Sequence, residues 1–240
     1  MKKLILLLLL MTTPSLANNH LFTLEQKAFL QEQIRETLVN NPEILLQAAN
    51  AYREQRQQQR QQQLKKIIKQ NQNRLFNDPN SPRLGAAEAK LVMVYFTDYN
   101  CSFCKQFDPL LIKIVQSQPQ VALIIKPLPF RAQSSVTAAR SALSLWKQDR
   151  EKFWLLHHRL MAKKGYHDNA SIKAAEQKIG INLMQFDSQT LDTINDNLAL
   201  AQQLDVQGTP ATLIGSQVLS GAVSYEQLQG IVKIELEKLK

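Results

Sequence analysis

The stretch from Leu91 to Val115, LVMVYFTDYNCSFCKQFDPLLIKIV, decides the fold. Residues 91–96 form a short apolar run, which predicts a buried β-strand, and residues 107–115 carry apolar side chains at helical spacing. Cys101 and Cys104 lie between these two segments and are the two cysteines of the chain. The sequence therefore places both thiols at one strand-to-helix junction.

The spacing of the two cysteines favours redox chemistry over a structural role. A disulfide between Cys101 and Cys104 closes so short a loop that it removes little entropy from the unfolded chain. The other common use of a CxxC pair, half of a zinc site, needs a second pair of ligands. The chain offers four histidines and no further cysteine, and the adjacent His157 and His158 point in different directions on a predicted helix. We therefore expect a redox pair, no metal site and no cofactor, with one of these two histidines packed and the other solvated.

The position of the two thiols on the predicted helix gives them different roles. Unsatisfied backbone amides and the positive end of the helix dipole stabilise a thiolate over a thiol. We therefore expect a lowered pKa for Cys101, which makes it both a nucleophile and a good leaving group. Cys104 lies one turn further into the helix and is the expected buried resolving thiol.

Residues 1–17 have the layout of an export signal. Lys2 and Lys3 precede an apolar block, and the tripeptide that ends at Ala17 is a small-x-small cleavage site. The block is too short for an ordinary membrane span, and an uncleaved anchor is the alternative. We expect cleavage near Ala17 and a periplasmic protein, because an extracytoplasmic compartment permits disulfides that the cytosol would reduce.

The basic charge of the chain does not indicate a nucleic-acid-binding protein. The formal net charge is +9, and much of it lies between Arg53 and Arg74. These basic residues alternate with glutamine on a predicted helix and have no aromatic residues among them, which is typical of a solvated helix face. We expect no nucleic-acid partner.

The segment upstream of the cysteines, residues 18–63, is predicted to be helical. Thr23 and Gln26 have capping-box spacing at the start of a first helix, and Pro42 opens a second. Residues 53–63, REQRQQQRQQQ, have no apolar side chain and form either an exposed helical spacer or a flexible link. The apolar side chains of residues 21–52 cannot form a sufficient core alone in so short a segment, so we expect a homodimer or homotrimer through them. The alternative is that these helices fold back onto the main domain.

The remainder of the chain, residues 64–240, is predicted to be an α/β domain. The order is strand, cysteine-bearing helix, strand, helical block, two strands and helix, which predicts a mixed sheet with helices on both faces. After the cysteine-bearing helix the predicted elements are a strand at 121–126, helices within about 134–204, a hairpin of 211–214 and 217–219, and a helix at 225–239. Pro210, at the entrance to the hairpin, is either an ordinary turn proline or part of a cis Thr209-Pro210 bond beside the cysteines.

Four stretches carry a family resemblance. FTDYNCSFCKQFDPLL at 96–111, KPLPF at 126–130 and LDVQGTPATLIG at 204–215 resemble the DsbA-like family of thioredoxin-fold proteins. IRETLVNNPEILLQA at 34–48 resembles the N-terminal segment of the branch named suppressor of copper sensitivity protein C. The resemblance implies a thioredoxin fold with an inserted helical domain at about 131–204, preceded by an N-terminal helical oligomerisation segment.

The resemblance also implies roles for individual residues. Cys101 would attack and Cys104 would resolve, while Ser102 and Phe103 would tune the redox potential. Thr209-Pro210 would be the cis-proline loop that binds an extended substrate. Members with this kind of N-terminal segment are associated with oligomers and isomerase activity.

The sequence departs from the family at two positions. Relatives often carry an acid where this chain has Tyr95 and another where it has Pro127. The role of such a carboxylate as a proton relay for the resolving thiol is therefore in doubt here, and Asp98 and Lys126 receive no catalytic assignment.

The resulting hypothesis is an exported thiol-disulfide oxidoreductase that forms or isomerises disulfides through a mixed disulfide with Cys101. Its expected partners are exported cysteine-containing proteins and a membrane oxidant or reductant. Two alternatives remain open: a thiol protein that binds copper(I) or confers copper tolerance, and a non-enzymatic periplasmic chaperone.

Overall fold

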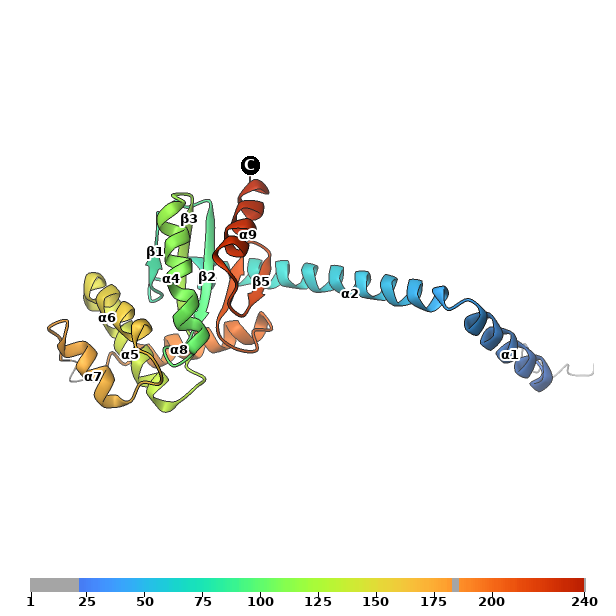
Figure 1. The fold of residues 1–240 in the computed structure, drawn as a ribbon, viewed down its shortest axis with the longest axis horizontal. Helices are drawn as coiled ribbons and strands as arrows, with labels where there is room; N and C mark the ends of the chain where they lie inside the picture. The colour runs from blue at the N-terminus through green and yellow to red at the C-terminus, as the bar shows by residue number, and fades with distance from the viewer. Residues whose placement is uncertain (1–21, 183–185, 240) are drawn as a thin grey trace, which may run out of the picture. The chain divides into compact units, whose positions relative to one another are not determined.

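A computed structural model gives the structure of the protein and describes residues 22–182 and 186–239 (Figure 1). The chain divides into two compact units, residues 1–57 and 58–240. The expected signal peptide and its cleavage near Ala17 lie outside the described residues. Within the described residues, no helix combines the length and the apolar character that a membrane span requires.

The N-terminal unit consists of helix α1 (Leu24–Asn40) and the first part of helix α2 (Glu43–Gln70). The expected capping box is formed: the Thr23 hydroxyl accepts a hydrogen bond from the Gln26 amide, and the Gln26 side chain accepts one from the Thr23 amide. Helix α2 continues through residues 53–63, so this run is an exposed helix and not a flexible link. All residues of α1 and α2 are described, and none is buried.

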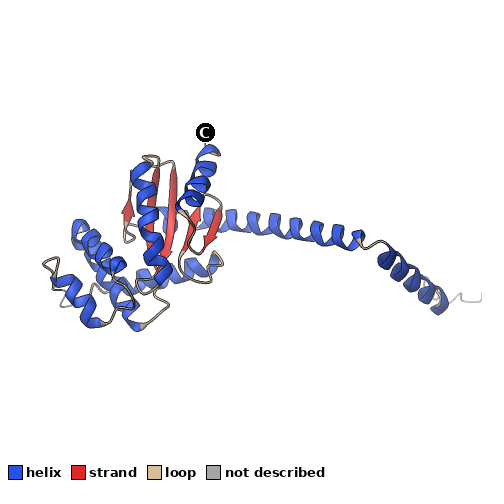
Figure 2. Cartoon of the chain, in the orientation of Figure 1, coloured by secondary structure: helices blue, strands red, loops and turns tan. Residues whose placement is uncertain are grey.

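The second unit is built on a five-stranded mixed sheet with the order β1-β3-β2-β4-β5 (Figure 2). Strands β2 and β3 are parallel, and the other neighbours are antiparallel. The strands are β1 (Arg83–Leu84), β2 (Leu91–Thr97), β3 (Val121–Pro127), β4 (Ala211–Ile214) and β5 (Gln217–Ser220). The sequence predicts all of these except β1, which is two residues long and pairs with β3 at the edge of the sheet.

Both faces of the sheet are covered, which explains why β2 and β3 are apolar except near their C-terminal ends, where Thr97 and Lys126 lie. Successive side chains of β2 point to opposite faces, so Met93 and Tyr95 lie in one hydrophobic cluster and Val94 and Phe96 in another. The first cluster includes residues of α4 (Ser102–Ser117) and α9 (Tyr225–Glu237), and the second includes residues of α3 (Gln72–Phe76) and α8 (Gln189–Gln203). The C-terminal end of α2 also packs on the second cluster, starting at Leu64.

The helical insert lies between β3 and β4, as the sequence predicts. It contains α5 (Gln133–Gln148), α6 (Arg150–Ala162) and α7 (Asn169–Gln177), followed by α8. Trp146 and Phe153 bring α5 and α6 into the first cluster, with their ring centroids 5.4 Å apart. The insert therefore shares its core with the cysteine-bearing helix α4.

Candidate active site

The loop after β2 sets Cys101 at the start of α4. Its backbone is extended and it is the N-cap residue of the helix, while its amide donates to the Asp98 carbonyl at 3.0 Å. The Cys101 sulfur accepts a hydrogen bond from the Cys104 amide at 3.4 Å. Both cysteines are free thiols, and their exposed fractions are 1% for Cys101 and 0% for Cys104.

The surroundings of the two thiols drive their pKa values apart. A hydrogen bond from the Cys104 thiol is the largest influence on the pKa of Cys101. Together with the contact with Thr209, the hydrogen bond from the Cys104 amide and the charge of Arg131, it lowers that pKa to about 5 against the opposing effect of burial. Burial, followed by the hydrogen bond with Cys101, raises the pKa of Cys104 far above that of an ordinary thiol. At neutral pH Cys101 is therefore a thiolate and Cys104 a thiol.

The Thr209-Pro210 peptide bond is cis, which decides between the two interpretations of Pro210. The loop lies directly at the cysteines, since the Cys101 sulfur lies 3.2 Å from the Thr209 carbonyl oxygen, which accepts a hydrogen bond from the protonated thiol. The resemblance implies that the polar backbone of Thr209 is available to a substrate, and a Cys101 thiolate has no proton with which to occupy its carbonyl. The structure thus brings the two cysteines and the Thr209-Pro210 loop together, although they are far apart in the sequence.

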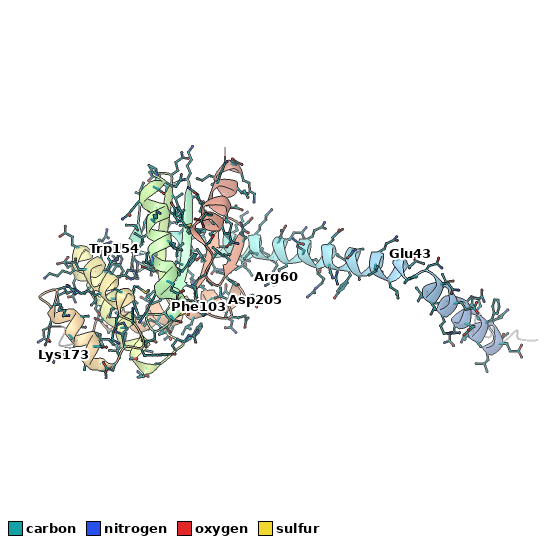
Figure 3. All side chains as sticks on the ribbon, in the orientation of Figure 1. Glu43, Arg60, Phe103, Trp154, Lys173 and Asp205 are labelled. Carbon is teal, nitrogen blue, oxygen red and sulfur yellow. The ribbon has the colours of Figure 1, made fainter. Side chains whose placement is uncertain are left out.

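The two residues between the cysteines are both exposed. Phe103 has 58% of its surface exposed and projects from the first turn of α4 (Figure 3). Ser102 is also exposed on the same turn. Both side chains are placed where an approaching protein would meet them, which is compatible with the tuning role that the resemblance implies.

Three residues near the cysteines have roles that the sequence alone did not indicate: Asn100, Ser135 and Arg131. The Asn100 side chain donates to the Ser135 hydroxyl at 3.0 Å and accepts from the His167 amide at 2.6 Å, which ties the loop before Cys101 to the insert. Arg131 is exposed and lies in the connection between β3 and α5. These contacts join positions more than thirty residues apart, and no local pattern marks them.

Lys126 does not lie against the cysteines. Its buried ammonium donates to the Ser81 hydroxyl at 2.9 Å, to the Asn197 side chain at 3.3 Å and to the Asp78 carboxylate at 3.4 Å. Burial lowers the pKa of Lys126, although the charge of Asp78 opposes this. Lys126 therefore belongs to a buried polar cluster that links β3 to α8 and to the segment before β1.

Tyr95 occupies the strand position where relatives often carry an acid. Its hydroxyl donates to the Cys104 carbonyl at 3.2 Å, so this residue contacts the active-site helix without bringing a charge. Burial, reinforced by the nearby Cys104 and Asp108, raises the pKa of Tyr95 well above that of an exposed tyrosine. The phenol is neutral at physiological pH and cannot serve as a carboxylate would.

The two adjacent histidines separate as expected into one packed and one exposed side chain. His157 is fully buried, with the Tyr99 hydroxyl 3.0 Å from Nδ1 and the Asp108 carboxylate 3.0 Å from Nε2. His158 is exposed on the same helix. Within residues 22–182 and 186–239, no group of three or more histidine, cysteine or acidic side chains could hold a metal ion.

Comparison with known proteins gives matches to both parts of the chain. The family model described as Thioredoxin matches residues 77–234, and the one described as Copper resistance protein ScsC N-terminal domain matches residues 26–59. A solved linker-deletion variant of Proteus mirabilis ScsC is 44% identical, with 92% of this chain and 99% of that chain covered and a TM-score of 0.73.

Two further relatives extend the comparison. A periplasmic thioredoxin-like protein from Salmonella enterica serovar Typhimurium is 52% identical, covering 69% of this chain and 95% of that chain with a TM-score of 0.67. Disulfide bond formation protein D of Bacillus subtilis is 24% identical over 175 residues, which is 65% of this chain and 77% of that protein. The chain therefore belongs to the DsbA-like thiol-disulfide oxidoreductases of the thioredoxin family, in the ScsC branch.

Proposed function

We propose that Cys101 and Cys104 carry out thiol-disulfide exchange in the periplasm and that the protein forms or isomerises disulfide bonds in exported proteins. The observation that carries this proposal is the place of Cys101 at the start of α4, where its sulfur accepts the Cys104 amide at 3.4 Å and its surroundings lower its pKa to about 5. The Salmonella relative is described as periplasmic, and the Bacillus relative is named for disulfide bond formation. Both descriptions support the proposed location and reaction.

The first step is nucleophilic attack by Cys101 on a substrate disulfide. A new S–S bond joins Cys101 to one substrate sulfur, the old bond breaks, and the second substrate sulfur leaves as a thiolate. If that or another substrate thiolate then attacks the substrate sulfur of the mixed disulfide, Cys101 leaves as a thiolate and the substrate is isomerised without net redox change. If Cys104 instead loses its proton and attacks the Cys101 sulfur, the substrate is reduced by two electrons and the protein becomes oxidised.

Formation of a substrate disulfide is the reverse of the Cys104 route. A substrate thiolate attacks the Cys101 side of the Cys101–Cys104 disulfide, and Cys104 leaves and takes up a proton, as its raised pKa favours. A second substrate thiolate then releases Cys101, and the protein is left reduced. An oxidase therefore needs a membrane oxidant and an isomerase needs a membrane reductant, and we propose one such redox protein as a partner.

The exposed apolar side chains of residues 22–57 support self-association. Ten large apolar residues in this unit are between 39% and 85% exposed: Phe22, Leu24, Phe29, Leu30, Ile34, Val39, Ile44, Leu45, Leu46 and Tyr52. Such a concentration of exposed large apolar side chains in a short segment is typical of a region that binds a partner. We propose that a second or third copy of the chain covers it, giving a homodimer or homotrimer. Several active sites in one assembly favour isomerisation, because one substrate can meet more than one Cys101.

The chemical part of the proposal is tested with Cys101→Ser and Cys104→Ser in the full chain. Cys101→Ser should abolish refolding of a scrambled disulfide substrate and reduction of a model disulfide. Cys104→Ser should still form mixed disulfides, which would accumulate because the resolving thiol is missing. Equal refolding by wild type and Cys101→Ser would contradict the redox mechanism and favour a non-enzymatic chaperone.

The assembly part is tested by molecular mass in solution, measured for the mature chain, for a chain that starts at Leu64, and for a full-length Phe29→Glu, Leu45→Glu variant. Leu64 is the first residue of α2 that packs on the core of the second unit. We expect monomers from both altered proteins, with oxidase activity retained and isomerase activity lost. An unchanged mass for the Glu variant would contradict self-association through this surface.

Copper(I) binding is the second candidate, and the family description of residues 26–59 as a copper resistance protein domain favours it. Two thiolate sulfurs suffice chemically for this soft ion. Binding would require Cys104 to lose a proton despite its raised pKa, so it should be weak at neutral pH and strengthen as the pH rises. Titration of the reduced protein with copper(I) tests this, and an absence of uptake by wild type would remove the candidate.

A further inference from the structure

Asp98 holds Cys101 and Arg131 side by side. Its backbone carbonyl accepts the Cys101 amide at 3.0 Å, and one oxygen of its carboxylate accepts the Arg131 amide at 2.9 Å. Asp98 is only 1% exposed, so both bonds are shielded from water. A single buried residue thus fixes the distance between the nucleophile and the connection from β3 to α5.

Two further hydrogen bonds, one to the second carboxylate oxygen of Asp98 and one between neighbouring residues, make this arrangement rigid. The second carboxylate oxygen accepts the Asn100 amide at 2.7 Å, which closes a tight turn before Cys101. The Leu128 amide donates to the Thr97 carbonyl at 2.7 Å, which joins the two chain segments on the other side of Asp98. The buried carboxylate is therefore fully used as a hydrogen-bond acceptor for backbone amides, as a buried charge requires.

Arg131 and Cys101 influence each other's pKa. The charge of the Cys101 thiolate is the largest influence that raises the pKa of Arg131, and the charge of Arg131 is one of the influences that lower the pKa of Cys101. The other nearby cation, Lys105, already donates to the carbonyls of Lys163 and Gly165 at 2.8 and 2.6 Å. Arg131 is exposed, so its side chain is free to follow the sulfur during the reaction.

We propose that Arg131 is a catalytic residue whose guanidinium stabilises the Cys101 thiolate, and that Asp98 is a positioning residue that holds Arg131 there. This inference rests on the proposed role of Cys101 as the nucleophile. It gives Asp98 a function without making it a proton relay, since both of its carboxylate oxygens are engaged by backbone amides.

The guanidinium acts whenever Cys101 carries the negative charge. When a substrate thiolate attacks the substrate sulfur of the mixed disulfide, the S–S bond to Cys101 breaks and the electron pair leaves with Cys101. Because Arg131 stabilises that thiolate, Cys101 leaves without taking up a proton. The same contact favours the reduced protein over its disulfide and makes the disulfide a stronger oxidant.

The experiment is a pH titration of the thiolate absorbance of the reduced full-length protein. Arg131→Gln should raise the pKa of Cys101 by roughly half to one unit, and Arg131→Lys should stay near wild type because it keeps the charge. By linkage, the equilibrium constant for reduction of the Arg131→Gln disulfide by glutathione should fall about three- to tenfold at neutral pH. Arg159→Gln removes the same charge from an exposed position on α6 and should change neither quantity.

The role of Asp98 is tested by combining Asp98→Ala with Arg131→Gln. If Asp98 positions the guanidinium, Arg131→Gln should change the pKa of Cys101 much less in the Asp98→Ala background than in wild type. An equal change in both backgrounds overturns the positioning role. Equal pKa values for wild type and Arg131→Gln, or equal rises for the Gln and Lys variants, overturn the role of Arg131. If the titrating absorbance of wild type persists in Cys101→Ser, the assignment of the nucleophile is wrong, which is a separate failure.

Discussion

The two units of the chain contain similar helices that are stabilised in different ways. Helix α1 has a complete capping box and good helix formers but buries no residue, whereas α4 begins at Cys101 without such a box and buries seven residues, including Phe107 and Leu111. The helices of the second unit are thus held by tertiary packing, while those of the first depend on local hydrogen bonds and on whatever covers their apolar side chains. The proposed redox chemistry lies in the unit that is complete by itself, and the proposed self-association lies in the unit that is not.

The largest effect should come from removing a core aromatic ring. Phe107→Ala should lower the free energy of unfolding of the second unit by about 3–5 kcal/mol, because Phe107 is fully buried on α4. The matched change Phe29→Ala, at a residue of α1 that is 64% exposed, should leave the unfolding of the second unit unchanged and lower only the mass in solution. Chemical unfolding monitored in the second unit measures the stability of both variants, and the mass in solution is measured separately. A large loss from Phe29→Ala would show that the two regions do not differ in this way.

The next largest effect concerns the pH dependence of stability in the reduced protein. The pKa of Cys101 is about 5 when folded, against an ordinary value of 9.0, so the folded state binds fewer protons between these values. Stability should therefore rise with pH from about 5 towards 9, by at most about 1.4 kcal/mol per pH unit. Above pH 9 the raised pKa of Cys104 reverses the trend, because the unfolded thiol then ionises and the folded one does not.

Urea unfolding of wild type and Cys101→Ser under reducing conditions isolates this dependence. The difference between the two proteins should grow from pH 5 to pH 8, and oxidised wild type should lack the rise because it has no free thiol. Apolar substitutions in residues 22–57 should leave the slope unaltered. A constant difference between wild type and Cys101→Ser would contradict a thiolate confined to the folded second unit.

A smaller effect should distinguish the ion pairs of the two units. Burial raises the pKa of Asp78, but the hydrogen bond from Ser81 and the charge of Lys126 outweigh it, so the pKa of Asp78 is lowered. Asp78→Asn should cost about 2 kcal/mol, because it leaves the fully buried Lys126 ammonium without its counter-charge. Adding Lys126→Met should recover part of that loss. Glu32→Gln, which breaks the exposed pair with Arg35 on α1, should have no measurable effect on thermal unfolding.

The parts of the structure that could be predicted from the sequence are those with a local cause. The continuous apolar runs of β2 and β3, the helical spacing after Cys101 and the Thr23 cap each depend on neighbouring residues, and each lies where the sequence predicts it. The sequence does not predict strand β1, because two residues carry no periodicity and its pairing is imposed by β3.

The candidate site was only partly predictable, for the same reason. Cys101 and Cys104 share a motif, and Pro210 is conspicuous at a strand entrance, but the sequence left its cis state open. Arg131 has no local pattern: its amide is held by the carboxylate of Asp98, which is 33 positions earlier in the chain. The sequence does not assign a role to Lys126 for a similar reason, since its partners Asp78 and Asn197 are brought to it only by the fold.

The smallest effect should locate where the second unit begins along α2. The Arg60 guanidinium lies 2.6 Å from the Asp205 carboxylate, and both residues belong to the unit of residues 58–240 (Figure 3). Both side chains are exposed, so Arg60→Ala should lower stability by less than about 0.5 kcal/mol. Amide hydrogen exchange should nevertheless change locally: residues 58–63 should lose protection, while protection from Leu64 onward is kept by packing on the core. Arg56→Ala, one turn earlier on α2, is the matched control and should alter neither the stability nor the amide protection of residues 58–63. Unchanged protection in Arg60→Ala would mean that the apolar contacts starting at Leu64 alone set the boundary between the two units.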